Sequence, residues 1–496
     1  MRFTDVLHGL EYEIIQHGDS DSVTGVVIDS RKVMEGCLYV CLRGLTVDGH
    51  KFVEEVAKDG AAAILIDREM ESYPLGVVVL KVDDARRSLA HVAANFHGRP
   101  ADKLRLFGVT GTNGKTSVTY MMEAILGHSG KASCGPAVGL VGTVGLRLDG
   151  KIIDIPFSTS TTPDPHELHQ VFKHVIENYG KDVVMEVSSH ALALHKMEGL
   201  CFEAAMFTNL TQDHLDFHGT MENYLAAKAK LFGQCRYGVV NADDKYSQQI
   251  MTIGSPERWF TYGIENECDL RAIHITDEMA GSAFDLEVNE NIYKNFYIPV
   301  KGRFNIYNAL AAIGAALAVG IDIEVIKAGL AGFSGVPGRI QSVPNDRGFH
   351  VLVDYAHTPD GLVNIINAVR GFTEGRLITL FGCGGDRDAS KRPIMGRIAG
   401  ELSDHCILTS DNPRSEPPEE IIRQIEEGIK ETNSTYDCFV DRREAISHGI
   451  SILKPGDALI IAGKGHETYQ IIGDETFEFD DAEIANAILK KEALDK

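Results

Sequence analysis

The sequence predicts an α/β protein of three domains, and three observations lead to that prediction. First, 496 residues are too many for one hydrophobic core, and three domains are the natural division. Second, strands alternate with helices through residues 101–334, and a similar alternation runs through 335–496. Third, residues 104–127 read as a buried strand, a glycine-rich turn and a helix. We therefore expect a small N-terminal α/β domain over residues 1–100 and parallel sheets in the other two domains.

The composition is that of a globular protein, and the net charge argues against some classes of binding partner. Apolar residues make up 44% of the chain and charged residues 24%. The net charge of −23 argues against binding to nucleic acid or to anionic membranes, whereas an anionic small molecule needs only local positive charge. No apolar run is long enough to span a bilayer. Nine cysteines without a C-x-x-C pair, and no signal-peptide pattern, predict a cytoplasmic protein.

The first hundred residues mix short strands with helical segments. The expected strands are 23–29, 37–42, 63–66 and 77–79, and the expected helices are 52–59 and 85–96. Residues 29–32 (DSRK) follow a strand, and residues 46–50 (TVDGH) form a polar loop. Each of these two segments is more typical of a surface turn than of a binding site. Residues 98–100 (GRP) indicate a linker.

The glycine-rich turn at 110–116 (TGTNGKT) has the pattern of a phosphate-binding loop. It lies between an apolar strand at 104–109 and a segment with helical spacing. Gly111 and Gly114 can adopt positive φ, which lets backbone N–H groups converge on an anion. The N-terminus of the following helix adds partial positive charge.

The two residues at the end of this turn predict binding of a nucleoside triphosphate. In such loops a lysine at the position of Lys115 contacts the β- and γ-phosphates, and a hydroxyl at Thr116 binds Mg²⁺. Val109 stands where the common pattern has glycine. An ordinary connection between a strand and a helix is therefore the alternative interpretation.

Two further residues of the central domain follow strands and are candidates to bind the metal. Glu186 lies in the strand 182–187, and His214 lies in a polar segment after the strand 204–207. Mg²⁺ prefers oxygen ligands, usually one or two carboxylates with phosphates and water, and an imidazole can complete the set. The alternatives are a carboxylate that caps a helix and a loop histidine with an ordinary hydrogen bond.

Lys228 lies in a predicted helix at 224–232 (YLAAKAKLF), between alanines that favour close packing. A lysine on a helix is most often solvated. A buried lysine, in contrast, tends toward the neutral amine, which is reactive. The residues alone do not identify its reaction partner.

Polar or glycine-rich loops follow four of the five strands expected in the C-terminal domain. The strands are 350–353, 377–381, 405–408, 438–440 and 458–461, and the loops are 354–357, 382–387, 409–414 and 463–467. Because ligands bind at the carboxyl ends of parallel strands, we expect these loops to face the phosphate-binding loop. Residues 382–387 (GCGGDR) do not match G-x-G-x-x-G, so a nicotinamide dehydrogenase is a poor interpretation. Residues 411–414 (DNPR) form either a proline turn or a carboxylate-binding arginine site.

Together these motifs resemble one family, the Mur ligases. The matching segments are 110–116 (TGTNGKT), 186–190 (EVSSH), 209–216 (NLTQDHLD), 241–244 (NADD), 302–308 (GRFNIYN) and 354–360 (DYAHTPD). The resemblance covers nearly the whole chain and does not depend on one motif. It implies an ATP- and Mg²⁺-dependent amino-acid ligase of peptidoglycan precursor synthesis. It also implies an N-terminal domain that holds a UDP-linked substrate, a central ATPase domain of the P-loop type and a Rossmann-like C-terminal domain.

Within that family, three C-terminal loops resemble those of one particular member. The loops 382–388 (GCGGDRD), 411–414 (DNPR) and 463–467 (GKGHE) are similar to the member that adds meso-2,6-diaminopimelate to UDP-N-acetylmuramoyl-L-alanyl-D-glutamate. The DNPR segment implies diaminopimelate rather than L-lysine as the incoming amino acid. We expect a monomer that binds small molecules, and neither nucleic acid nor a membrane. The alternatives are a folylpolyglutamate synthetase and, from another class, a nucleotide-gated binding protein with a degenerate ligase site.

The resemblance also implies which residues form the site. For ATP these are Gly111, Thr112, Asn113, Gly114, Lys115, Thr116, Ser117, Asn305, Asn308, Arg339 and Asp354. For the UDP-muramoyl dipeptide they are Ser30, Thr161, Thr162, Ser188 and Lys196. For diaminopimelate they are Arg387, Asp411, Asn412, Pro413, Arg414, Gly463 and Glu467.

The catalytic residues implied by the resemblance are Lys115, His214 and Lys228. Lys228 would be carbamylated and would bind Mg²⁺ together with Thr116, Glu186 and His214. The sequence departs from some relatives at Leu194 and Lys196, where they carry Gln and Arg. Lys196 keeps a positive charge toward a substrate carboxylate but not the two-pronged geometry of arginine.

Overall fold

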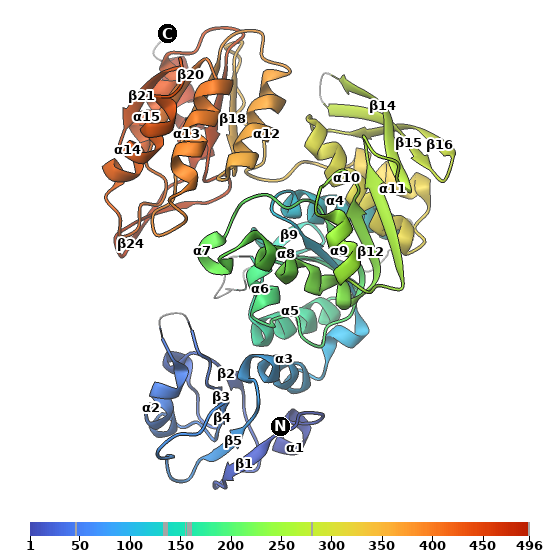
Figure 1. Cartoon of the computed structure of the whole chain (residues 1–496), viewed down its shortest axis with the longest axis vertical. Coiled ribbons are helices and arrows are strands. Elements are labelled where there is room, and N and C mark those ends of the chain that lie inside the picture. The colour runs from blue at the N-terminus through green and yellow to red at the C-terminus, as the bar shows by residue number, and fades with distance from the viewer. Residues whose placement is uncertain (45–46, 132–136, 154, 156–160, 279–280, 495–496) are drawn as a thin grey trace.

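The protein folds into three α/β domains, as the sequence predicts, and Figure 1 shows them following one another along the long axis of the molecule. This computed structural model describes residues 1–44, 47–131, 137–153, 155, 161–278 and 281–494. Of the predicted loop at 46–50, Thr46 lies outside these residues. No helix within the described ranges is long and apolar enough to cross a membrane.

The N-terminal domain is a sheet in the order β1-β5-β4-β3-β2, in which β1 is antiparallel to its neighbour and the other strands are parallel. Its strands are β1 (Glu13–Gln16), β2 (Val26–Val27), β3 (Leu38–Val40), β4 (Ala63–Ile66) and β5 (Val78–Lys81). Its helices are α1 (Phe3–Val6), α2 (Val53–Lys58) and α3 (Ala85–Phe96), with 3₁₀ turns η1 (Ser30–Lys32), η2 (Gly49–Phe52) and η3 (Pro100–Lys103). Clusters of buried apolar side chains form its core.

The strand predicted at 23–29 is too long, because only Val26–Val27 pair as β2. The side chain of Asp29 accepts a hydrogen bond from the backbone N–H of Arg31, which begins the turn η1 and ends the extended segment. The sequence does not predict β1 at all. This strand is partly exposed at the edge of the sheet, so it lacks an apolar run.

The central domain is built on a sheet in the order β16-β15-β14-β13-β12-β11-β6-β10-β7-β8-β9. The strands from β14 to β7 in this order run parallel, and antiparallel strands extend the sheet at both ends. The strands are β6 (Arg105–Thr110), β7 (Val138–Gly142), β8 (Gly145–Leu148), β9 (Lys151–Ile153), β10 (Asp182–Glu186), β11 (Phe202–Phe207), β12 (Cys235–Asn241), β13 (Arg258–Gly263), β14 (Leu270–Glu278), β15 (Gly281–Val288) and β16 (Asn291–Ile298).

Helices pack on the central sheet. They are α4 (Lys115–Lys131), α5 (Pro165–Glu177), α6 (Ser189–Ala193), α7 (Leu215–His218), α8 (Met221–Ala229), α9 (Ser247–Ile253), α10 (Arg303–Ala318) and α11 (Ile323–Ala331). Helix α10 is buried on most sides, because its alanines allow close packing against α4 and the strands β12 and β13. The helix predicted at 224–232 divides into α8 and a 3₁₀ turn, η4 (Lys230–Gly233).

The C-terminal domain is a sheet in the order β17-β18-β22-β19-β20-β21, parallel except for β17. The strands are β17 (Gln341–Ser342), β18 (His350–Asp354), β19 (Leu377–Phe381), β20 (His405–Thr409), β21 (Thr435–Phe439) and β22 (Ala458–Ala462), with a separate hairpin of β23 (Tyr469–Ile472) and β24 (Glu475–Glu478). The helices are α12 (Pro359–Arg370), α13 (Lys391–Leu402), α14 (Pro418–Ile429), α15 (Arg442–Ser451) and α16 (Asp481–Leu494).

The strand predicted at 438–440 is misplaced, because β21 begins at Thr435 and ends at Phe439. Its pattern is mixed and partly exposed, as expected at the edge of a sheet, so the apolar signal marks only its last residues. The other predicted C-terminal strands agree with β18, β19, β20 and β22 within one residue. The parallel strands of this domain direct their carboxyl ends to one edge, and the predicted loops lie there.

Candidate active site

A cavity of about 720 Å³ lies between the central and C-terminal domains. The loops after β6, β10, β11 and β12 line it from the central domain, and the loops after β18, β19, β20 and β22 line it from the C-terminal domain. The two sets of loops therefore face one another, as the sequence predicts. The carboxyl ends of parallel strands are the usual position for ligands in open α/β sheets.

Most of the predicted site residues line this cavity, and five do not: Gly111, Ser30, Thr162, Lys196 and Pro413. Gly111 is part of the phosphate-binding loop, and its backbone carbonyl accepts a hydrogen bond from Lys115. Ser30 lies in the N-terminal domain. Lys196 is buried and forms an ion pair with Asp164 at 3.0 Å. In this arrangement, Lys196 already has a carboxylate partner within the protein.

Thr162 forms hydrogen bonds with two residues that line the cavity, Glu186 and Ser188. Its hydroxyl donates to the backbone carbonyl of Glu186 at 2.9 Å and accepts from the backbone N–H of Ser188 at 3.1 Å. Ser188 and Thr161 themselves line the cavity. Thr162 thus fixes the end of β10 rather than facing the open space.

The phosphate-binding loop has the backbone shape that the two glycines predict. Gly114 has φ of 86°, and a Cβ atom at this position would collide with the side chain of Asn308. At Gly111, with φ of 151°, a Cβ atom would collide with the hydroxyl of Thr208. Both positions therefore require glycine, because the neighbouring side chains occupy the space that a side chain would need.

Two lysines bind the same carbonyl oxygen beneath this loop. Lys115 Nζ donates to the carbonyl of Gly111 at 2.9 Å and to that of Thr112 at 2.8 Å. Lys228 Nζ donates to the carbonyl of Gly111 at 2.8 Å. Burial lowers the pKa of Lys115 and lowers that of Lys228 well below its ordinary range, with the charge of Lys115 as the second cause for Lys228. Lys228 is therefore biased toward the neutral, nucleophilic amine.

The groups around Glu186 fit a hard divalent cation. The Glu186 carboxylate, 1% exposed at the end of β10, accepts from the backbone N–H of Thr143 at 2.9 Å and from its hydroxyl at 3.1 Å. Thr116 and His214 line the same cavity, and burial lowers the pKa of His214 although Asp213 opposes the shift. A carboxylate, a hydroxyl and a neutral imidazole are a suitable donor set for magnesium together with phosphate oxygens and water.

Six basic side chains line the cavity without an internal carboxylate partner. Among the described residues, no Asp or Glu oxygen lies within 4.0 Å of the charged group of any of these six. The six side chains are Lys115, Lys228, Arg339, Arg387, Lys391 and Arg414. The buried Nε of Arg339 also has no hydrogen-bond partner within the described part of the chain. Basic side chains that form no ion pair within the protein are available to bind the anionic groups of a ligand.

Two asparagines of α10 and an aspartate at the end of β18 also line the cavity. Asn308 donates to Asn305 at 3.3 Å, and Asn305 donates to the carbonyl of Lys301 at 2.8 Å. The Asp354 carboxylate accepts from the backbone N–H groups of residues 340 and 356, both at 2.8 Å. Burial raises the pKa of Asp354, and Arg339 opposes the shift. Asn305, Asn308 and Asp354 thus present amide and carboxyl groups to the cavity in fixed positions.

On the C-terminal domain, a buried network fixes Asn412. Its side-chain amide donates to Glu467 at 2.8 Å and accepts from Lys464 at 3.1 Å, and Lys464 also pairs with Glu467 at 3.2 Å. Lys464 is fully buried. Arg414 donates to the carbonyl of Gly385 at 2.9 Å, so its position is fixed without neutralising its charge. This wall thus carries acids in fixed positions and guanidinium groups that form no ion pair with a described Asp or Glu.

Arg442 is a supporting residue that the sequence does not reveal. Its side chain is fully buried and pairs with Asp481 through two bonds of 2.8 and 2.7 Å. It also donates to the carbonyl of Ala462 at 2.9 Å and to that of Ser410 at 3.4 Å. These carbonyls stand at the ends of β22 and β20, where two cavity loops begin. Arg442 therefore holds both loops against α16.

One side-chain contact joins the phosphate-binding loop directly to the C-terminal domain. The amide of Asn113 donates to the carboxylate of Asp360 at 2.7 Å, and Asp360 lies in the first turn of α12. Burial raises the pKa of Asp360, while its bonds to Asn113 and Asn364 oppose the shift. The relative position of the two walls is thus linked to the loop that would hold phosphate.

Three family models match successive parts of the chain. They are described as "Mur ligase family, catalytic domain" for residues 22–97, "Mur ligase middle domain" for 109–316 and "Mur ligase, glutamate ligase domain" for 338–465. Relatives from Caldanaerobacter subterraneus subsp. tengcongensis and Clostridium botulinum are 46% and 43% identical, and both alignments cover at least 99% of each chain. Both relatives are named UDP-N-acetylmuramoyl-L-alanyl-D-glutamate–2,6-diaminopimelate ligase.

Solved structures give the same fold. A structure titled with that same ligase name is 30% identical, covers 99% of both chains and superposes with a TM-score of 0.68. Folylpolyglutamate synthase from Mycobacterium tuberculosis, solved with ADP, superposes with a TM-score of 0.63 at 17% identity, over 76% of this chain and 91% of that one. The second similarity shows a common fold alone.

The buried pair of Arg442 and Asp481 predicts a specific pattern of stability. Arg442→Met should lower the free energy of unfolding by about 3–5 kcal/mol, because Asp481 would remain buried without its partner. Combining it with Asp481→Leu should recover most of the loss, since an apolar pair of similar size is often neutral. Urea unfolding followed by circular dichroism measures both effects.

The matched control is Arg423→Met, which removes an exposed arginine paired with Glu420 and Glu427 on α14. Its urea midpoint should stay close to that of the wild type, because exposed ion pairs contribute little. A double variant of Arg442 and Asp481 as unstable as Arg442→Met alone would contradict the role of the pair.

Proposed function

Because the chain belongs to the Mur ligase family, we propose that it joins meso-2,6-diaminopimelate to UDP-N-acetylmuramoyl-L-alanyl-D-glutamate at the expense of ATP. The reaction belongs to peptidoglycan precursor synthesis and forms a peptide bond, ADP and phosphate. The observation that carries the proposal is the group of six basic side chains without internal partners on both walls of one cavity. A triphosphate and two carboxylate-bearing substrates would provide anionic partners for these basic side chains.

The triphosphate is assigned mainly to the central-domain wall, and Arg339 and Asp354 are contributed by the C-terminal domain. Backbone N–H groups of the loop at 110–116 and the ammonium of Lys115 would contact its phosphates, and Arg339 would add a second cation. Lys115 donates to two carbonyls of its own loop, and these bonds support the assignment because they hold the ammonium at the loop. Asn305, Asn308 and Asp354 are assigned to the nucleoside end. Together these residues of the two walls would bind and orient ATP.

Magnesium is assigned to Thr116, Glu186, His214 and a modified Lys228. The neutral amine of Lys228 attacks carbon dioxide, forming an N–C bond and releasing a proton, and thereby becomes a carbamate with one negative charge. This modification turns an amine into an oxygen ligand, which is the donor type that magnesium prefers. When bound there, the metal neutralises charge on the phosphate oxygens. The depressed pKa of Lys228 favours the carbamylation.

The reaction proceeds in two steps between bound substrates. The γ-carboxylate of D-glutamate attacks the γ-phosphorus, forming a carboxyl O–P bond while the bond to the β,γ-bridging oxygen breaks and ADP leaves. The amine of diaminopimelate then attacks the acyl carbon, phosphate leaves with the acyl oxygen, and the amine loses its proton. The protein contributes position and charge neutralisation in both steps, since phosphoryl transfer requires little else.

The C-terminal wall is assigned to diaminopimelate because its charges match a zwitterion. The distal end of this amino acid carries one carboxylate and one ammonium, whereas L-lysine carries only the ammonium. Arg387 and Arg414 are the cations for the carboxylate, and Asp411 and Glu467 are the acids for the ammonium. Asn412, Pro413 and Gly463 belong to the same loops.

The N-terminal domain, residues 1–100, is assigned to the UDP end of the substrate, with Ser30 as a contact. Residues 101–334 are assigned to ATP and residues 335–496 to the incoming amino acid. Thr161 and Ser188 are assigned to the peptide end, with Thr162 and Lys196 nearby. We further propose a monomer in the cytoplasm, which size-exclusion chromatography with light scattering and fractionation of cells would test.

Removing the ammonium of Lys115 should abolish catalysis without unfolding the protein. Lys115→Ala should reduce ATP-dependent ligation by at least about 100-fold, because the transferred phosphoryl group loses a fixed cation. Product mass and phosphate release measure the effect. Lys103→Ala, an exposed lysine of the turn η3, is the control and should remain active. Near-normal turnover of Lys115→Ala would refute the assignment.

The carbamate at Lys228 can be tested separately. Lys228→Ala should be inactive and partly rescued by formate or acetate, because a free carboxylate can replace the lost ligand. Labelled ¹³C-bicarbonate should give a carbamate signal in the wild type and in Lys230→Ala, the exposed lysine two residues away, but not in Lys228→Ala. Full activity of Lys228→Ala without rescue would show that the lysine is only structural.

The choice of amino acid should depend on Arg414. The wild type should form product with meso-diaminopimelate in preference to L-lysine, as product mass would show. Arg414→Ala should raise KM for diaminopimelate by about 100-fold and leave KM for ATP unchanged, because a charged partner of the carboxylate is lost. Arg397→Ala, an exposed arginine on α13, is the control. Equal use of both amino acids by the wild type would contradict the substrate assignment.

A further inference from the structure

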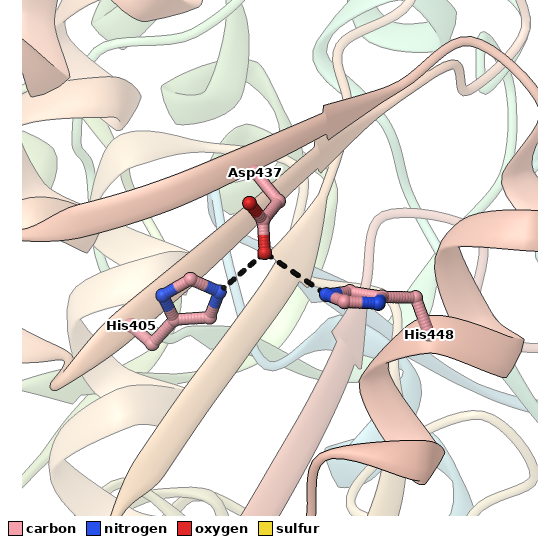
Figure 2. A group of neighbouring side chains, drawn as sticks. All are labelled: His405, Asp437 and His448. Atoms are coloured by element: carbon pink, nitrogen blue, oxygen red, sulfur yellow. Dashed lines mark hydrogen bonds and ion pairs between the residues drawn. The ribbon is translucent and has the colours of Figure 1, made fainter.

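A second group of metal-ligating side chains lies away from the active site. His405 begins β20, Asp437 lies in β21 and His448 lies in α15, and Figure 2 shows the three side chains converging. The active-site loop at 411–414 follows the opposite end of β20. None of the three residues lines the cavity between the domains. The group is therefore separate from the machinery that acts on ATP.

The two distances from Asp437 to the histidine nitrogens are close to the ligand spacing of a filled metal site. Oδ2 of Asp437 lies 3.1 Å from Nε2 of His405 and 2.9 Å from Nε2 of His448. All three atoms lie within 4.8 Å of one another. Ligands about 2.0–2.1 Å from a tetrahedral zinc ion are about 3.3 Å apart. Shifts of a few tenths of an ångström in the Asp437 contacts would bring its oxygen to that spacing.

The surroundings of His405 orient its ring toward the shared position. Nδ1 of His405 lies 2.9 Å from the hydroxyl of Thr435, which neighbours it across β20 and β21. A partner on one ring nitrogen fixes the imidazole and leaves the other nitrogen free to bind a metal, as is usual for histidine ligands. His405 is also the most buried of the three, with 15% of its side chain exposed.

The site is open on one side. The side chains of His448 and Asp437 are 32% and 45% exposed, so an ion can enter from solvent and water can complete its coordination. Two imidazoles and one carboxylate form a set typical of zinc and related transition metals. Magnesium prefers oxygen ligands and an octahedral shell, so it would not compete effectively here.

We propose that His405, Asp437 and His448 form a zinc site that joins β20, β21 and α15 at the edge of the C-terminal domain. The three ligands come from three different elements, so they assemble only in the folded domain. A metal that binds the folded state alone raises the melting temperature by mass action. Zinc would therefore stabilise the domain from which the 411–414 loop extends, without taking part in the ligation.

The test measures zinc uptake by the full chain in the presence of saturating Mg²⁺, which should fill the magnesium site proposed at Thr116, Glu186, His214 and Lys228. Isothermal titration should show one zinc equivalent for the wild type, and saturation should raise the melting temperature of the C-terminal domain by about 5 °C. His448→Ala and Asp437→Asn should lose both the equivalent and the shift. Their melting curves in EDTA establish that they are folded, and Asp437→Asn retains the size of the side chain and both imidazoles.

The control is His274→Ala, because His274 forms an exposed pair with Asp285 at 3.0 Å that is not part of a three-ligand group. This variant should bind zinc as the wild type does. Cobalt should give visible absorption bands of a low-symmetry site in the wild type and not in His448→Ala. Absence of zinc uptake by the wild type, or equal uptake and stabilisation in His448→Ala, would overturn the proposal.

Discussion

The carbonyl oxygen of Gly111 is the point on which the active site depends. It accepts hydrogen bonds from two buried amines, those of Lys115 and Lys228. The glycine at this position is itself required, because Thr208 occupies the space of a Cβ atom. One backbone carbonyl thus contacts both Lys115, the lysine proposed to bind phosphate, and Lys228, the lysine proposed to be carbamylated. The depressed pKa of Lys228 follows from this closeness and from burial.

On the C-terminal wall, the cavity loops are supported by a buried side chain that does not line the cavity. The carbonyls at the ends of β20 and β22 bind Arg442, whose charge is balanced by Asp481 of α16. The arginines that face the cavity, Arg387 and Arg414, form no ion pair with a described Asp or Glu. Glu467 on the same wall is held in place by Asn412 and Lys464. The proposed binding of a zwitterion at this wall rests on this rigid support and on the unpaired arginines.

Features that depend on neighbouring residues could be predicted from the sequence. The strand, turn and helix around 110–116 follow from local apolar spacing and two glycines, and the structure confirms them. Features that join distant segments could not be predicted in this way. Arg442 and Asp481 lie 39 residues apart and resemble ordinary charged residues at helix ends. The cluster of His405, Asp437 and His448 could not be predicted from the sequence either, because the spacing of the three residues follows no motif.

The bond between Asn113 and Asp360 has a consequence for inhibitor design. It shows that the two walls of the cavity approach to within direct contact, so a single small molecule can reach both. Such a compound acts as a cross-link, because binding to one domain presents its other end to the second domain at high effective concentration. A phosphate mimic joined to an amino-acid mimic by a linker of matched length should exceed the affinity of either fragment by orders of magnitude. The optimal linker length would in turn report the separation of the domains in solution.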